Sequence, residues 1–168
     1  HFADNGYLSE ALQNLETSDF VRAYSYFGKK KRNVTYQLCD FYTMFYLKFV
    51  KQHYGKDEHF WTHSIDLPQR RAWAGLMFEQ VCHWHIPQIK TALGISGILS
   101  EHSAWYERKA DDDITSRGAQ IDMVIARRDR VINLCEMKFS IGPFSIDGEY
   151  EMNLRNKIAT FRSLTKTT

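Results

Sequence analysis

Gln120-Ile121-Asp122-Met123-Val124-Ile125 and Leu134-Cys135-Glu136-Met137-Lys138 are the two stretches that determine the predicted fold. Both are largely apolar, as expected of strands that line a core. The charged segment Arg127-Arg128-Asp129-Arg130 lies between them and predicts a turn. We therefore expect two strands, at residues 119–126 and 131–139, joined as an antiparallel hairpin.

Each predicted strand carries one acid among apolar neighbours, and the length of the loop sets how the acids pair. A loop of residues 128–130 pairs Asp122 directly with Glu136, whereas other short loops shift the register by a residue or two. On the direct register the two Cβ atoms lie about 5 Å apart. The two carboxylates repel each other at that distance unless a cation lies between them. Glu136 also shares a strand face with Lys138, because side chains two positions apart point the same way.

Two carboxylates, with the remaining coordination positions left to water and phosphate, suit Mg²⁺. Such an ion lowers the pKa of a bound water and stabilises charge on a phosphate. Lys138 is placed to orient the attacking water or to balance the developing negative charge. Glu79, an acid among apolar residues of a predicted helix, is a candidate for a further ligand. The structural alternative is that Glu136 and Lys138 form a surface ion pair while Asp122 faces solvent.

The segments around the hairpin complete an α+β domain over residues 72–168. Apolar residues recur at helical spacing from Trp73 to Trp84, and residues 103–109 are typical of a strand. Residues 150–164 are expected to form a helix after the hairpin. Tyr150 and Lys157 on that helix are candidates for contact with a substrate phosphate.

Residues 1–56 have the pattern of part of a winged helix. A helix at residues 7–15 is followed by two alternating segments, 20–27 and 34–38, which predict a pair of strands. The turn between these strands, together with a neighbouring position, supplies a basic patch of Arg22, Lys29, Lys30, Lys31 and Arg32. This patch predicts non-specific contact with DNA phosphates, and the alternative is a solvated hairpin tip. Asp40 is expected to cap an aromatic helix, and the polar residues 57–71 are interpreted as a linker.

The composition of the 168 residues is that of a folded protein, with 43% hydrophobic and 14% aromatic residues. No apolar run approaches the roughly 20 residues needed to span a bilayer, so no membrane partner is expected. The three cysteines occupy separate apolar positions, which predicts free buried thiols in a reducing cytoplasm.

The order Glu79, then Gly118-Ala119-Gln120-Ile121-Asp122, then Cys135-Glu136-Met137-Lys138 resembles the PD-(D/E)xK nuclease superfamily. Through the stretches at residues 73–79 and 133–139, nearly the whole chain resembles the C-terminal region of a prokaryotic ATPase family. In that family a P-loop ATPase domain is followed by a winged helix and a PD-(D/E)xK-like domain. The chain itself contains no G-x-x-x-x-G-K-[ST] motif, so ATP binding is not assigned to it.

The resemblance implies catalytic or metal-binding roles for Glu79, Asp122, Glu136 and Lys138, with Gln120 as an auxiliary residue. It implies a metal-dependent endonuclease with Mg²⁺ as cofactor and Mn²⁺ able to substitute. DNA and an attached P-loop ATPase domain are the implied partners, and oligomerisation is left open. The superfamily core runs helix, three strands, helix and a further strand, and we expect that last strand to be missing after Thr168. The alternatives are a catalytically inactive DNA-binding or regulatory module of the ATPase, and a protein-interaction scaffold.

Overall fold

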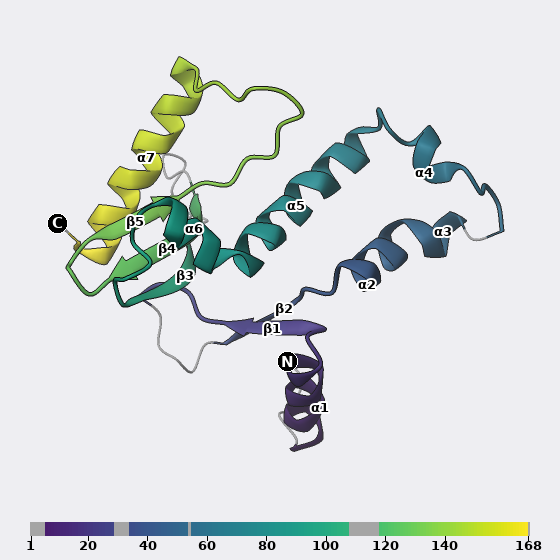
Figure 1. Cartoon of the computed structure of the whole chain (residues 1–168), viewed down its shortest axis with the longest axis horizontal. Coiled ribbons are helices and arrows are strands. Elements are labelled where there is room, and N and C mark those ends of the chain that lie inside the picture. The colour runs from purple at the N-terminus through teal and green to yellow at the C-terminus, as the bar shows by residue number, and fades with distance from the viewer. Residues whose placement is uncertain (1–5, 29–33, 54, 108–117, 168) are drawn as a thin grey trace, which may run out of the picture. The chain divides into compact units, whose positions relative to one another are not determined.

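The computed structural model describes residues 6–28, 34–53, 55–107 and 118–167 (Figure 1). It is a mixed α+β structure with two small antiparallel sheets, which confirms the predicted class. The chain divides into two compact units, one of residues 1–24 and 34–80 and the other of residues 25–33 and 81–168.

The first unit consists of helices and one β-hairpin, which follows the first helix. In chain order they are α1 (Gly6–Thr17), β1 (Val21–Tyr24), β2 (Thr35–Leu38), α2 (Phe41–Phe45), the π-helix η1 (Tyr46–Val50), α3 (Lys51–His53), α4 (Phe60–His63) and most of α5 (Pro68–Trp84). The second unit contains the end of α5, then α6 (Ile86–Ala92), β3 (Ser100–Glu107), β4 (Ala119–Arg127), β5 (Ile132–Cys135) and α7 (Gly148–Thr165).

The helix and hairpin predicted for the first unit are present. Strands β1 and β2 pair antiparallel, from Val21 across from Leu38 to Tyr24 across from Thr35. Residues 29–33, which include most of the predicted basic patch, lie outside the described residues. Helix α1 contains no buried residue, so its leucines remain at least partly exposed.

An aromatic cluster forms the core of the first unit. The rings of Phe45, Phe49, Trp61 and Trp73 have centroids between 5.0 and 5.8 Å apart, largely in tilted or edge-to-face arrangements. Such pairs stabilise a core beyond the area that they bury. The guanidinium of Arg70 lies 4.0 Å from the Trp61 ring centroid and donates to the Trp61 carbonyl oxygen.

The residues predicted as a linker, 57–71, contain helix α4 and the first turn of α5. Trp61 of this segment packs into the aromatic cluster, so an apolar anchor lies inside a stretch of polar composition.

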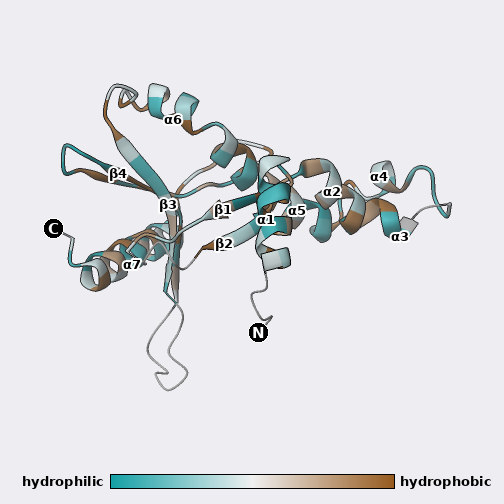
Figure 2. Ribbon diagram, turned by 90° about the horizontal axis from the view of Figure 1, so that it is seen from below, coloured by the Kyte–Doolittle hydropathy of each residue, from teal (hydrophilic) through white to brown (hydrophobic). Residues whose placement is uncertain are grey.

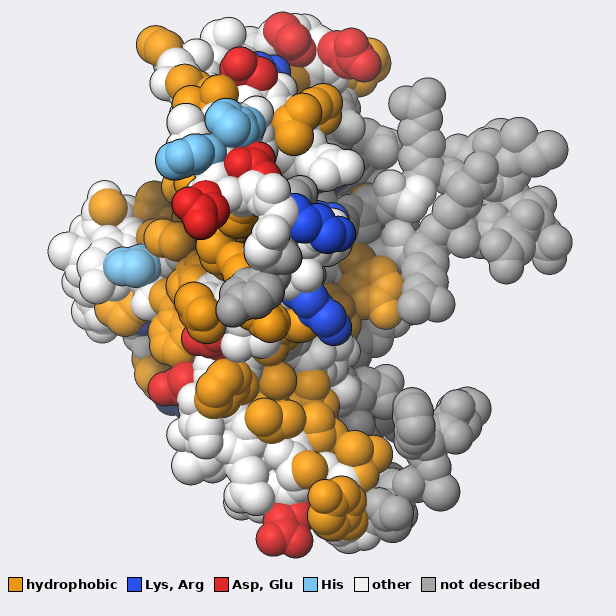
Figure 3. All heavy atoms as spheres, turned by 90° about the vertical axis from the view of Figure 1, so that its right-hand side faces the viewer, with side chains coloured by type: hydrophobic (Ala, Val, Ile, Leu, Met, Phe, Trp, Pro, Cys, Tyr) orange, Lys and Arg blue, Asp and Glu red, His pale blue; other side chains and the backbone are white. Residues whose placement is uncertain are grey.

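Asp40 caps α2 as predicted, because its carboxylate accepts a hydrogen bond of 2.6 Å from the backbone N–H of Thr43. On the face shown in Figure 3, apolar side chains are interspersed with charged ones, as is usual for protein surfaces.

Strand β4 is the centre of the second unit. It pairs antiparallel with β3 on one side and with β5 on the other. Helix α7 packs on one face of this sheet through Phe161, which is 2% exposed. Hydrophobic and hydrophilic residues alternate along α7, as expected of an amphipathic helix (Figure 2).

A β-bulge interrupts the ladder between β3 and β4. The register shifts between Ser103 and Trp105, which leaves Asp122 and Met123 of β4 across from Ala104 alone. An extra residue of this kind changes which side chains face the core. As a result, residues on both sides of the bulge join one core cluster, which contains Ala119, Ile121, Val124, Trp105 and Phe161.

Helix α7 begins at a capped end. The carboxylate of Asp147 accepts a hydrogen bond of 2.7 Å from the backbone N–H of Tyr150, which fixes the first turn of α7.

The three cysteines are free thiols. None of the helices in the described ranges is long and apolar enough to cross a bilayer.

Candidate active site

The hairpin of β4 and β5 has the register that a loop of residues 128–130 predicts. Met123 lies across from Cys135 and Ala126 across from Ile132. The backbone N–H of Arg127 donates to the carbonyl oxygen of Val131 at 2.9 Å and closes the loop. Continuing this register by one residue places Asp122 across from Glu136. The observed ladder ends at Met123 and Cys135, so the direct pairing of the two acids stays a prediction.

Strand β5 is shorter than the predicted strand 131–139, which is corrected here to Ile132–Cys135. The reason lies in the side chain of Asp122. Its Oδ2 atom accepts a hydrogen bond of 2.8 Å from the backbone N–H of Met137. A side-chain carboxylate thus takes the place that a backbone carbonyl would have in a continuing ladder. One carboxylate oxygen of Asp122 is therefore hydrogen-bonded to the backbone of Met137. Lys138 lies beyond the end of β5.

Glu136 is paired with a lysine from α7. Its Oε1 atom accepts a hydrogen bond from the Lys157 ammonium at 2.5 Å, and the two side chains are only 16% and 20% exposed. Burial raises the pKa of Glu136, and the negative charge of Asp122 raises it further, against the opposing effect of Lys157 and Lys138. The carboxylates of Glu136 and Asp122 are therefore close enough to interact electrostatically.

Tyr150 lies beside this carboxylate pair. Its hydroxyl oxygen is buried and has no hydrogen-bond partner among the described residues. Burial raises the pKa of Tyr150, and the negative charges of Glu136 and Asp122 raise it further. The hydroxyl therefore keeps its proton at neutral pH and is available as a donor.

Lys138 is exposed, and its ammonium lies 5.5 Å from the centroid of the Tyr150 ring. This distance is within the range of a cation–π contact. The structural alternative was a surface ion pair of Glu136 with Lys138, whereas Glu136 forms its ion pair with Lys157. The sequence indicated Lys157 only as a possible phosphate contact, because nothing in its spacing links it to Glu136.

The remaining predicted residues belong to other parts of the chain. Gln120 is exposed, and strand alternation directs it away from the face of Ala119 and Ile121, which pack with Phe161. Glu79 is half-buried in the part of α5 that belongs to the first unit, and its role as a ligand stays a prediction. Arg22 is half-buried in β1. The positions of Lys29, Lys30, Lys31 and Arg32 lie outside the described residues.

A cluster of acidic, basic and phenolic side chains thus lies on one side of the sheet. Its members are Asp122, Glu136, Tyr150, Lys138 and Lys157. In the described part of the chain, no three or more histidine, cysteine or acidic side chains are grouped as a metal site. Two carboxylates are nevertheless a sufficient donor set for Mg²⁺, which keeps several waters and binds substrate phosphates. The donor chemistry therefore fits the ion that the sequence predicts.

Compared with protein-family models, with curated proteins and with solved structures, the chain matches none of them.

Proposed function

We propose that residues 72–168 form a PD-(D/E)xK nuclease-like domain that hydrolyses phosphodiester bonds in DNA. The observation that carries the proposal is the position of Asp122, which lies at a β-bulge, accepts a hydrogen bond from the backbone of Met137 and interacts electrostatically with the neighbouring carboxylate of Glu136. Bulges are frequent beside active sites, where they redirect a side chain. Residues 1–56 are proposed to be a partial winged helix, and the proposed parent protein is a prokaryotic P-loop ATPase.

Asp122 and Glu136 hold the proposed Mg²⁺ ion, for which Mn²⁺ can substitute, and Glu79 is a proposed further ligand. When bound, the ion supplies an activated water and stabilises negative charge on the scissile phosphate. Asp122 keeps its hydrogen bond to Met137 and presents its second carboxylate oxygen. The raised pKa of Glu136 is consistent with a carboxylate that a second positive charge would stabilise.

The basic and phenolic side chains complete the proposed mechanism. Lys138 is exposed, so that it can approach a phosphate and orient the attacking water. Lys157 balances the charge of Glu136 in the absence of substrate. The unpaired hydroxyl of Tyr150 donates to a phosphate oxygen or to the attacking water. Arg22 and the basic residues 29–32 are proposed contacts to the DNA backbone, and Gln120 keeps its proposed auxiliary role.

A second function is favoured by one specific contact. The ion pair of Glu136 with Lys157 already neutralises one carboxylate of the pair without any metal. An internal cation of this kind would suit a catalytically inactive module that binds DNA or regulates the attached ATPase. The two functions differ in whether Glu136 exchanges Lys157 for a divalent cation.

Cleavage of supercoiled plasmid by the 168-residue chain distinguishes them. With Mg²⁺ or Mn²⁺ we expect nicking that EDTA abolishes. Asp122→Asn, Glu136→Gln and Lys138→Ala should each lower the rate on the order of 100-fold or more. Asn is preferred to Ala at position 122 because its carbonyl oxygen still accepts from Met137. Arg155→Gln is the matched control, since Arg155 is a 77% exposed cation on the same helix as Lys157.

Cleavage that survives both Asp122→Asn and Glu136→Gln would rule out this site. DNA binding without cleavage would favour the inactive module. In that case, simultaneous replacement of Lys29, Lys30, Lys31 and Arg32 by alanine should weaken binding and reduce its salt dependence.

A further inference from the structure

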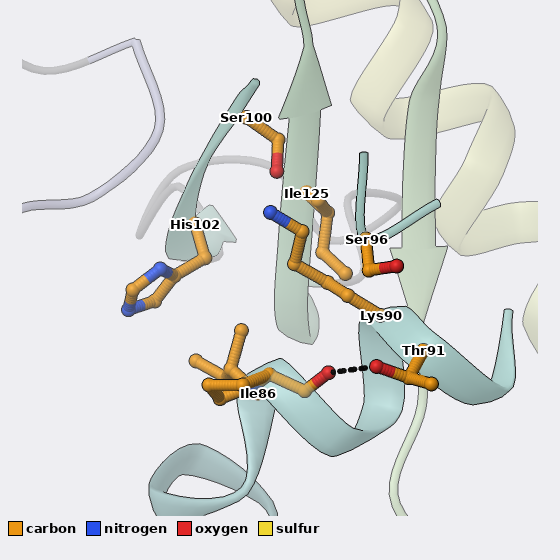
Figure 4. A pocket seen from close by; sticks show the side chains of 8 residues that line it. Ile86, Lys90, Thr91, Ser96, Ser100, His102 and Ile125 are labelled. Carbon is orange, nitrogen blue, oxygen red and sulfur yellow. Dashed lines mark hydrogen bonds between the residues drawn. The ribbon is translucent and has the colours of Figure 1, made fainter. Parts of the chain in front are cut away.

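A pocket of about 260 Å³ lies in the second unit between helix α6 and strands β3 and β4 (Figure 4). Ile125 of β4 forms its floor and is fully buried. His102 of β3 lies directly across from Ile125 in the ladder and also lines the pocket. Ile125 alternates with Val124, which packs with Phe161 of α7. The pocket is therefore on the face of the sheet opposite to α7.

Lys90 contributes a positive charge to this pocket. Figure 4 shows its side chain extending from α6 towards the strands, with Ser100 and His102 around its end. The Lys90 ammonium makes one long hydrogen bond, 3.4 Å, to the carbonyl oxygen of Ile98. An ammonium has three N–H donors, so this single long hydrogen bond leaves donor capacity for a ligand in the pocket.

The hydroxyl of Ser100 is the feature that points to a ligand. Its oxygen is buried and has no hydrogen-bond partner among the described residues. Buried polar groups nearly always have a partner, because an unpaired one destabilises the folded state. Thr91 does not fill this need, since its hydroxyl donates to the Pro87 carbonyl oxygen at 3.0 Å, as the dashed line in Figure 4 marks.

The rest of the lining defines what kind of molecule fits. Among the described residues that line the pocket, none is acidic, so none of them opposes the charge of Lys90. Ile86, Pro87 and Ile125 form an apolar side. The volume is slightly below the roughly 300 Å³ at which pockets for drug-sized ligands begin. A small molecule with one anionic group and a compact apolar or ring portion matches this lining.

We infer that the pocket beneath α6 binds a small organic phosphate. Its phosphate group accepts hydrogen bonds from Lys90, Ser100 and His102, and its organic portion lies on Ile86 and Ile125. This inference does not depend on the proposed nuclease function, because the pocket and the carboxylate cluster lie on opposite faces of the sheet. A phosphate monoester at the end of a nucleic acid has the same chemistry as a free small phosphate, and both sources are tested below.

Calorimetric titration with phenyl phosphate, inorganic phosphate and phenol tests the inference at constant ionic strength. Phenyl phosphate should bind at least tenfold more tightly than inorganic phosphate, and phenol should show no measurable binding. Perturbed amide signals in NMR spectra should map to α6 and the start of β3. A 5′-phosphorylated oligonucleotide that competes with phenyl phosphate, when the unphosphorylated one does not, would identify a nucleic-acid end as the source. Failure of both oligonucleotides to compete would identify a small molecule.

Two substitutions make the test specific. Lys90→Gln should weaken phenyl phosphate binding at least tenfold, whereas Lys51→Gln, at an exposed lysine of α3, should leave it unchanged. Ser100→Ala should weaken binding severalfold and at the same time raise the melting temperature of the ligand-free protein, because it removes an unpaired buried hydroxyl. Ser163→Ala, at an exposed serine of α7, is its control. Absence of binding at millimolar phenyl phosphate, or binding unaffected by both Lys90→Gln and Ser100→Ala, would overturn the inference.

Discussion

Lys157 of α7 donates a 2.5 Å hydrogen bond to the carboxylate of Glu136, a residue 21 positions earlier that follows the end of β5. This pair attaches α7 to the hairpin at the point where the candidate site lies. Because both side chains are largely buried, each depends on the other for its neutralising charge.

Lys157→Met should therefore destabilise the second unit. The substitution leaves a mostly buried carboxylate without its cation, and we expect a loss of about 1–3 kcal/mol in the free energy of unfolding. Urea denaturation measures this loss. Arg155→Met removes an exposed cation from the same helix and should change stability by less than about 0.5 kcal/mol. Equal losses for the two variants would show that the Glu136 pair contributes no more than a surface pair.

Removing Lys157 should also change the response to Mg²⁺. If Asp122 and Glu136 bind the ion, its binding stabilises the folded state by mass action. The Lys157→Met variant no longer has a competing ammonium, so millimolar Mg²⁺ should raise its melting temperature more than that of the wild type. Lys157→Met combined with Glu136→Gln is the control, and it should show no such rise.

The pH dependence of stability should report the raised pKa of Glu136. The folded protein holds this proton more tightly than the unfolded chain does, for which the ordinary value is 4.5. The contribution of Glu136 to the free energy of unfolding is therefore fully present below about pH 4.5. It is lost as the pH rises through the raised pKa of Glu136 in the folded state. Glu136→Gln should remove this part of the pH dependence. Glu151→Gln, at an exposed glutamate of α7, should retain it.

Two substitutions of Asp122 separate its charge from its hydrogen bond. Asp122→Ala leaves the backbone N–H of Met137 without its acceptor and should lower the free energy of unfolding by about 1–3 kcal/mol. Asp122→Asn keeps a side-chain oxygen and should cost clearly less. Hydrogen exchange of the Met137 amide gives a local readout, which should accelerate in the alanine variant. Equal exchange rates in both variants would contradict the assigned contact.

Arg130 occupies the left-handed region at φ +67° in the loop between β4 and β5. A side chain is unfavourable there, so Arg130→Gly should stabilise the hairpin by about 1 kcal/mol without changing its register. Thermal denaturation is the measurement. Arg128→Gly, in the same loop but without a positive φ, is the control and should not stabilise the protein.

The sequence predicted most of the elements because their signals are local. Asp40 caps a helix through a contact three residues away, and a loop of residues 128–130 predicts the register in which Met123 lies across from Cys135. The features that were missed depend on distant parts of the chain. Trp61 lies in a polar stretch and is recognisable as core only once Trp73 packs against it.

The same reason applies to the candidate site. The early end of β5 follows from the carboxylate of Asp122 reaching Met137, which residue types along β5 do not indicate. The partnership of Glu136 with Lys157 depends on how α7 docks on the sheet. The sequence thus predicted that Asp122 and Glu136 interact, and it left open which lysine neutralises Glu136.

Because of the bulge at Asp122, strand β4 pairs differently with its two neighbouring strands. Towards β5 the pairing is regular, while towards β3 the strand contains one residue more than its partner needs. Deleting a residue at this point would bring β4 and β3 into continuous register and, in the same step, displace Asp122 from Glu136. The extra residue is therefore a position at which a single codon deletion could preserve the sheet and still remove the paired carboxylates.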